Sequence, residues 1–217
     1  MAKPVFLAQQ GRCPSGVLGH IVAWVMARET KSENLKTLEL LDLSQDDDVL
    51  EIGFGHGETL QAVSKLVRRG TLAGVEFSDV MLTRASSLNR DLIRNGQLEL
   101  RKGDSRELPF GCKSFDKVFT VHTIYFWDDP LEDLEEVYRV LRPGGRFVIA
   151  YRSSDDKQAI NSFPASIYSF RTVDWVENTL DGLGFANIST QTGKLRNRLL
   201  HWTSAHRPEQ RFSPSVY

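Results

Sequence analysis

A glycine-rich turn at residues 49–57 could hold a ligand close to the backbone. Its three glycines, Gly53, Gly55 and Gly57, allow a tight turn between an apolar segment and a following helix. Free N–H groups at the start of that helix can donate hydrogen bonds to a carboxylate or a phosphate. Glu51 adds a negative charge two residues before the first glycine. Turns of this composition occur in many α/β proteins, so identifying the ligand requires a second residue.

Glu76 supplies that second residue, because it ends the next apolar segment 19 residues after Gly57. A carboxylate in that place can accept hydrogen bonds from both hydroxyls of a ribose. The turn closes one residue earlier than the dinucleotide fingerprint and continues with Glu58, whose charge fits poorly against a pyrophosphate. A ligand with cationic groups fits better. S-adenosylmethionine meets these conditions, since it carries a sulfonium, an ammonium and one carboxylate.

Alternating strands and helices would position these residues. Short apolar runs predict strands at 49–53, 71–76, 98–103, 115–121 and 146–151. Amphipathic stretches predict helices at 58–68, 80–95, 131–141 and 173–183. This alternation indicates parallel βαβ units and an α/β fold with a doubly wound sheet. Two further strand candidates, 186–192 and 199–205, follow a polar loop and the last helix, and they predict an antiparallel hairpin at one sheet edge.

The first 45 residues show a different pattern. Glycines and prolines predict a mobile loop over residues 4–19. Apolar residues at helical spacing predict a helix from residue 17, and Asn34 is the expected N-cap of a second, short helix. We expect residues 1–45 to form an N-terminal helical cap, 46–207 the main domain and 208–217 an irregular tail. His20 and Trp24 lie one helical turn apart and would face an acceptor pocket, although packing on the sheet explains Trp24 equally well.

Composition limits the classes of function. The 217 residues are 41% hydrophobic and 25% charged, as in an ordinary soluble globular protein. A net charge of −1 gives no general attraction to nucleic acid or acidic membranes. The start lacks the apolar stretch of a signal peptide, and no run approaches the roughly 18 apolar residues of a membrane span. We expect a cytoplasmic protein without stable membrane insertion and without a metal, since Cys13 and Cys112 are too few for a zinc site.

Four blocks of the sequence resemble the class I S-adenosylmethionine-dependent methyltransferases, over roughly residues 45–150. They occur in the family's order, at 49–57, 74–78, 103–110 and 141–145. Within the family, the chain is most similar to the ubiquinone/menaquinone-biosynthesis-like branch. The resemblance implies a Rossmann-like sheet of seven strands whose last strand is antiparallel. Residues 121–127 depart from the polar, His-His-like segment frequent in the family, so no named substrate carries over.

The same resemblance implies how the cofactor is held. The glycines of the turn would line its methionine part, and Glu76 would hold the ribose. Phe77 would stack against the adenine, Asp104 would bond the adenine amino group, and Ser105 would lie close to the ring. The residues expected to bind the cofactor are Glu51, Gly53, Gly55, Gly57, Glu76, Phe77, Asp104, Ser105 and Val121.

His122 and Tyr125 are the candidates for catalysis. Methyl transfer from a sulfonium needs alignment and exclusion of water, and it needs a general base only where the acceptor must lose a proton. His122 stands at the carboxyl end of the expected fourth strand, where ligands bind in open α/β sheets, and an imidazole can accept a proton near neutrality. Trp127 could bind the substrate through its aromatic face. A histidine that only bonds the cofactor or packs, and aromatic residues that only fill the core, are the competing interpretations.

Three functions remain open at this point. The leading one is an enzyme that methylates a small molecule, with an aromatic or lipophilic acceptor favoured by the apolar N-terminal segment and the aromatic residues 125–127. A non-catalytic S-adenosylmethionine-binding protein would carry the same cofactor motifs. A nicotinamide-dependent oxidoreductase fits less well, because the third fingerprint glycine and a Tyr-x-x-x-Lys pair are missing. The sequence leaves the methylated atom and the oligomeric state open.

Overall fold

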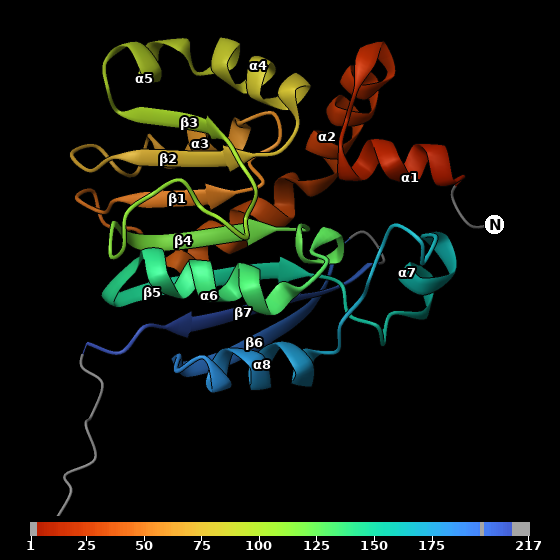
Figure 1. Ribbon diagram of the computed structural model, residues 1–217. Coiled ribbons are helices and arrows are strands. Elements are labelled where there is room, and N and C mark those ends of the chain that lie inside the picture. Colours follow the sequence, from red (N-terminus) through yellow and green to blue (C-terminus); the bar gives the residue numbers. More distant parts are fainter. Residues whose placement is uncertain (1–3, 196–197, 210–217) are drawn as a thin grey trace, which may run out of the picture.

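A seven-stranded sheet forms the centre of the protein (Figure 1). The computed structural model describes residues 4–195 and 198–209, and for residues 17–29 it describes the backbone alone. The strands are β1 (Val49–Ile52), β2 (Leu72–Glu76), β3 (Leu98–Lys102), β4 (Phe115–Val121), β5 (Leu141–Tyr151), β6 (Ala186–Leu195) and β7 (Arg198–His206). Their order in the sheet is β3-β2-β1-β4-β5-β7-β6.

The strand directions confirm the predicted fold class. Strands β1 to β5 pair in parallel with one another. Strand β7 lies between β5 and β6 and is antiparallel to both. The predicted hairpin of β6 and β7 is therefore present, and the last strand is the antiparallel one.

Helices cover both faces of the sheet (Figure 1). The described helices are α1 (Val5–Arg12), α2 (Gly16–Leu41), α3 (Glu58–Val63), α4 (Asp79–Leu88), α5 (Arg90–Arg94), α6 (Pro130–Val140), α7 (Lys157–Ser162) and α8 (Val173–Gly182), with a 3₁₀ turn at Ile124–Phe126. Side chains of α6 and α8 share one buried cluster with the sheet, and those of α2, α3 and α4 share another. Among the described residues, no helix combines the length and the apolar character needed to cross a bilayer.

Alternation along the central strands explains the two layers. In β5, Phe147 and Ile149 belong to the cluster of α6 and α8, whereas Val148 between them belongs to the cluster of α2 and α3. Helix α6 begins at Pro130, one residue before the predicted start. The Asp129 side chain caps it by accepting a hydrogen bond from the Leu131 N–H. Its Leu134 is completely buried, and such burial is worth about 1.5–3 kcal/mol.

The N-terminal segment differs from the prediction in two ways. Helix α1 and the start of α2 occupy most of the stretch expected to be a mobile loop. Gly11 is needed there for close packing, because a Cβ on it would lie 2.4 Å from the Tyr168 hydroxyl. Helix α2 runs without a break past Asn34, so the predicted second helix does not exist. The Asn34 side chain donates a hydrogen bond to Thr59 Oγ1 at 2.8 Å instead of capping a helix.

Two other local predictions need correction. The polar loop expected after Tyr151 contains α7, which Asp156 caps by accepting hydrogen bonds from the N–H groups of Gln158 and Ala159. The helix expected over residues 80–95 is divided into α4 and α5 at Asn89. The buried Asn89 amide donates hydrogen bonds to the Gly57 and Ala85 carbonyl oxygens, and thereby joins this break to the glycine turn.

Candidate functional site

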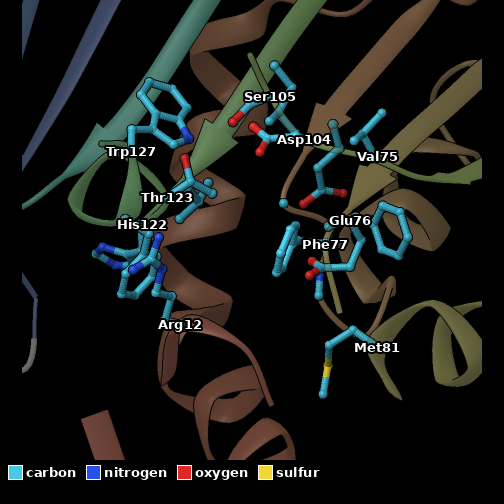
Figure 2. Close-up of a pocket in the computed structure, with 18 of the residues that line it drawn as sticks. Arg12, Val75, Glu76, Phe77, Met81, Asp104, Ser105, His122, Thr123 and Trp127 are labelled. Carbon is cyan, nitrogen blue, oxygen red and sulfur yellow. The ribbon is translucent and has the colours of Figure 1, made fainter. Parts of the chain in front are cut away.

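A cavity of about 300 Å³ lies at the carboxyl ends of β1, β2 and β4. This is the edge at which open α/β sheets bind ligands. Figure 2 shows Glu76, Phe77 and Asp104 on one side of it, and His122, Thr123 and Trp127 on the opposite side. The lining contains five carboxyl groups, those of Glu51, Glu76, Asp104, Asp128 and Asp133, against the two guanidinium groups of Arg12 and Arg106. This excess of carboxyl groups favours a ligand with cationic or hydrogen-bond-donating groups.

Most of the predicted site residues meet at this cavity. Those that line it are Glu51, Gly53, Gly55, Glu76, Phe77, Asp104, Ser105, Val121, His122 and Trp127. Gly57 and Tyr125 do not line it. The side chains of His20 and Trp24 fall outside the described residues, so their predicted contact with an acceptor stays a prediction.

The glycines of the turn have separate tasks. All three have positive φ, at +73° for Gly53, +55° for Gly55 and +81° for Gly57. A Cβ on Gly55 would point into open space, so this residue leaves room for a ligand against the backbone. A Cβ on Gly57 would lie 2.8 Å from the Ala85 Cβ, which means that Gly57 allows α3 to pack against α4.

Glu76 is fixed by the backbone on both of its carboxylate oxygens. Oε2 accepts a hydrogen bond from the Gly55 N–H and Oε1 accepts one from the Ser78 N–H, each at 2.9 Å. Burial raises the pKa of this carboxyl, and the backbone hydrogen bonds oppose that rise. Each oxygen keeps a further lone pair for a ligand donor. Glu76 can therefore accept two hydroxyl hydrogen bonds without losing its own anchors.

Glu51 carries a buried carboxyl group in the lining of the cavity. Its Oε2 has no hydrogen-bond partner among the described residues. Burial and the neighbouring charge of Glu76 raise its pKa well above the usual range. An unpartnered acid of this kind would be stabilised in its ionised form by a cationic group of a ligand.

Asp104 is held by Arg106 at the other end of the cavity. Its Oδ2 lies 2.8 Å from Arg106 Nη2, and its Oδ1 accepts hydrogen bonds from the Arg106 backbone N–H and Nε. The hydrogen bond from Arg106 lowers the pKa of Asp104. Phe77, which is 60% exposed, lies at the cavity with its ring available for stacking.

His122 belongs to a chain of hydrogen bonds that the sequence did not reveal. The Arg152 backbone N–H donates to the Tyr125 hydroxyl oxygen at 2.6 Å, so we assign the Tyr125 O–H as the donor to His122 Nδ1 at 2.8 Å. His122 Nε2 then carries the other proton and donates it to the carboxylate of Glu33 on α2. His122 itself has a φ of +61°, which is uncommon for a residue with a side chain. Both ring nitrogens are engaged.

Glu33 is a functional candidate missed by the sequence analysis. It is 2% exposed and lies on the side of α2 that also buries Thr37 and Leu41. An acidic residue at i, i+4, i+8 spacing with buried positions was the signal that could have identified it. Burial alone would raise the pKa of Glu33, but the hydrogen bond from His122 and the positive charges of Arg198 and Arg152 outweigh burial and lower it.

The segment between α1 and α2 closes the cavity near Glu76. Ser78 donates a hydrogen bond through its hydroxyl to the Pro14 carbonyl oxygen at 2.7 Å. Arg12 lines the cavity and lies 3.5 Å from Asp128, which follows Trp127. Figure 2 shows Arg12 on the same side as His122. Ala8 of α1 is buried in the same cluster as Tyr125 and Tyr168.

The known proteins to which this chain is similar are described or named as methyltransferases. A family model described as a methyltransferase domain matches residues 50–149. The Bacillus subtilis protein YrhH, named as a methyltransferase, is 33% identical over 121 residues, or 56% of this chain and 66% of that protein. The uncharacterized methyltransferase YdaC of the same organism is 26% identical over 87% of this chain and 98% of its own length. The demethylmenaquinone methyltransferase of Oceanobacillus iheyensis is 34% identical over 54% of this chain.

The coverage of these relatives varies. The chain spans nearly all of YdaC, but 66% of YrhH and 50% of the demethylmenaquinone methyltransferase. Placement in the menaquinone-like branch therefore stays a prediction. Among solved structures, a SAM dependent methyltransferase from Aquifex aeolicus superposes with a TM-score of 0.66 at 20% identity, covering 81% of this chain and 89% of that one. This likeness supports the fold.

Proposed function

The chain belongs to the class I S-adenosylmethionine-dependent methyltransferases, and we propose that it transfers a methyl group from this cofactor to an aromatic or lipophilic small molecule by in-line displacement. The observation that carries the proposal is the space beside Gly55. There, a backbone without a Cβ, the anchored carboxylate of Glu76 and the carboxyl of Glu51, one oxygen of which is unpartnered, line one cavity. This donor and acceptor set fits a ligand with ribose hydroxyls and positive charge.

The residues of the chain would divide the binding task as follows. When bound, S-adenosylmethionine supplies a methyl group on a positively charged sulfur, ready for attack by a nucleophile. Glu76 would accept the ribose hydrogen bonds, and Glu51 would offset positive charge. Arg12 and Pro14, at the segment that joins α1 to α2, would exclude water from the cavity. Phe77 and Asp104 would hold the adenine, as the sequence predicts.

His122 would control any proton that the acceptor has to lose. Proton acceptance at Nδ1 requires the Tyr125 hydroxyl to give way, because that hydroxyl occupies Nδ1. The carboxylate of Glu33 would then stabilise the imidazolium from the other ring nitrogen. Tyr125 is buried and does not line the cavity, so we propose for it a positioning role in place of a catalytic one. An acceptor that attacks without losing a proton would need neither step.

The aromatic or lipophilic nature of the acceptor rests on two observations. Phe126 and Trp127 both line the cavity close to His122, and aromatic faces enclose flat or apolar molecules. One of the relatives is named for a quinone substrate. Incubation with methyl-labelled cofactor and three acceptors, a naphthoquinol, a fatty acid and a hydrophilic amine, tests this class. We expect label in the quinol or the fatty acid. Label in the amine alone would refute the proposed acceptor class and would leave the assignment of the cofactor unchanged.

Calorimetric titration with S-adenosylhomocysteine, alongside NADH, tests the cofactor. We expect saturable binding of the former alone. In Gly55→Ala the new Cβ enters the cavity, and affinity should fall at least about tenfold. Gly96→Ala is the matched control, because Gly96 also has a positive φ, at +79°, and open surroundings, but does not line the cavity. Binding of NADH alone, or equal affinity in the two variants, would refute the assignment.

A further inference from the structure

Asp133 is a buried carboxyl group on the wall of the same cavity. It lies in the first turn of α6 and is 1% exposed. Its Oδ1 accepts a hydrogen bond from the Ser105 hydroxyl, whereas its Oδ2 has no partner among the described residues. Buried polar atoms are nearly always hydrogen-bonded, so an unpartnered carboxylate oxygen at a cavity needs an explanation. A hydrogen-bond donor on a ligand would satisfy it.

The neighbouring carboxylate of Asp104 is a weaker candidate acceptor for a ligand than Asp133. Asp104 is 40% exposed, and both of its oxygens already accept hydrogen bonds from Arg106. Asp133 is better shielded from water, and burial, together with the charge of Asp104, raises its pKa to about 7. The hydrogen bond from Ser105 opposes this rise. Asp133 and Asp104 therefore both line the cavity, next to Ser105, as possible hydrogen-bond acceptors.

We propose that Asp133 accepts a hydrogen bond from the exocyclic amino group of the adenine, beside Asp104, and so determines the specificity for adenine over a deaminated base. The inference rests on the proposed function, because it concerns the base of the proposed cofactor. The exocyclic amine is the donor that adenine offers, whereas its ring nitrogens accept. An amine has two N–H groups, and the two carboxylates can accept one each. Hypoxanthine carries a carbonyl oxygen in that place, which would face carboxylate oxygens and be repelled.

The experiment compares S-adenosylhomocysteine with S-inosylhomocysteine by calorimetry at pH 8.5, where Asp133 is ionised. We expect the wild-type protein to prefer the adenine ligand at least about 30-fold, since a hydrogen bond to a charged group typically contributes a factor of about 10 to 100. In Asp133→Asn the preference should fall at least about tenfold, because the new amide can donate to the carbonyl of hypoxanthine. Asp133→Ala should lose the preference mainly through weaker binding of the adenine ligand.

Glu132→Gln is the matched control, because Glu132 is an exposed neighbour on the same helix turn. It should keep the wild-type preference. A wild-type preference below about tenfold overturns the inference without any variant, as does a preference that survives in Asp133→Asn and disappears in Asp104→Asn. Failure of the wild-type protein to bind S-adenosylhomocysteine at all would instead overturn the proposed function, so the two failures are distinguishable.

Discussion

Replacing Glu33 removes the buried carboxylate that receives the His122 Nε2 proton. In Glu33→Ala the imidazole N–H loses its acceptor, and a space opens between α2 and β4. A buried donor that loses its acceptor typically costs about 1–3 kcal/mol, and the space left by the removed side chain adds to this cost. We therefore expect Glu33→Ala to cost about 3 kcal/mol. In Glu33→Gln an amide oxygen still accepts the hydrogen bond, and the expected cost is about 1–2 kcal/mol.

The pH dependence of this contribution follows from the lowered pKa of Glu33. A carboxyl whose pKa is lower in the folded state stabilises the protein above its ordinary value of 4.5, and this stability is lost as the pH falls through the folded value. The difference between wild type and Glu33→Gln should therefore be complete at pH 7 and shrink below pH 4.5.

Urea unfolding at pH 7 and pH 4 measures both effects. Glu39→Ala on the same helix is the control, since its side chain is 68% exposed and pairs with Lys36 at the surface. It should change the free energy of unfolding by less than about 0.5 kcal/mol. The reasoning is refuted if Glu33→Ala costs no more than Glu39→Ala, or if the difference between wild type and Glu33→Gln grows toward acid pH.

Four further predictions concern the cavity. Glu76→Ala should weaken S-adenosylhomocysteine binding at least about tenfold in calorimetry, and unchanged affinity in the folded variant would contradict the ribose assignment. His122→Ala should leave that affinity within a few-fold and, if the acceptor loses a proton, lower turnover; full turnover would show that His122 only lines the cavity. Gly57→Ala should cost at least about 2 kcal/mol in urea unfolding, because it combines a φ of +81° with a contact of 2.8 Å to Ala85, and a smaller cost would mean that α3 and α4 separate easily. S-adenosylmethionine should bind more tightly as the pH rises through the raised pKa of Glu51, with release of a proton detectable in buffers of different ionisation enthalpy; no proton release would show that Glu51 does not face the positive charge.

The sequence predicts the parts of this fold that depend on local patterns. Apolar runs locate the strands, and the glycine turn and Glu76 locate the edge of the sheet at which the cavity lies. Positions such as Gly53 carry this signal because a left-handed backbone strongly favours glycine. Two adjacent strand candidates, 186–192 and 199–205, predicted the antiparallel hairpin.

Those local patterns did not predict the contacts between segments that are distant in the sequence. Gly11 was interpreted as flexible, but it permits contact with Tyr168, which stands far away in the chain. Glu33 and Asp133 resemble ordinary polar positions of helices, and only the folded arrangement places them beside His122 and Ser105. The role of a buried acidic residue depends on the residue that it contacts, and no local sequence pattern identifies that residue.

The hydrogen bond from Ser78 to Pro14 has a consequence for the timing of ligand exchange. Ser78 also donates its backbone N–H to Glu76, so one residue connects the proposed ribose site with the segment that closes over it. The residence time of a bound ligand should thus depend on how often this connection opens. A chain without the Ser78 hydroxyl would release its ligand faster while every contact of Glu76 with that ligand is kept, and the dissociation rate would change independently of the chemistry.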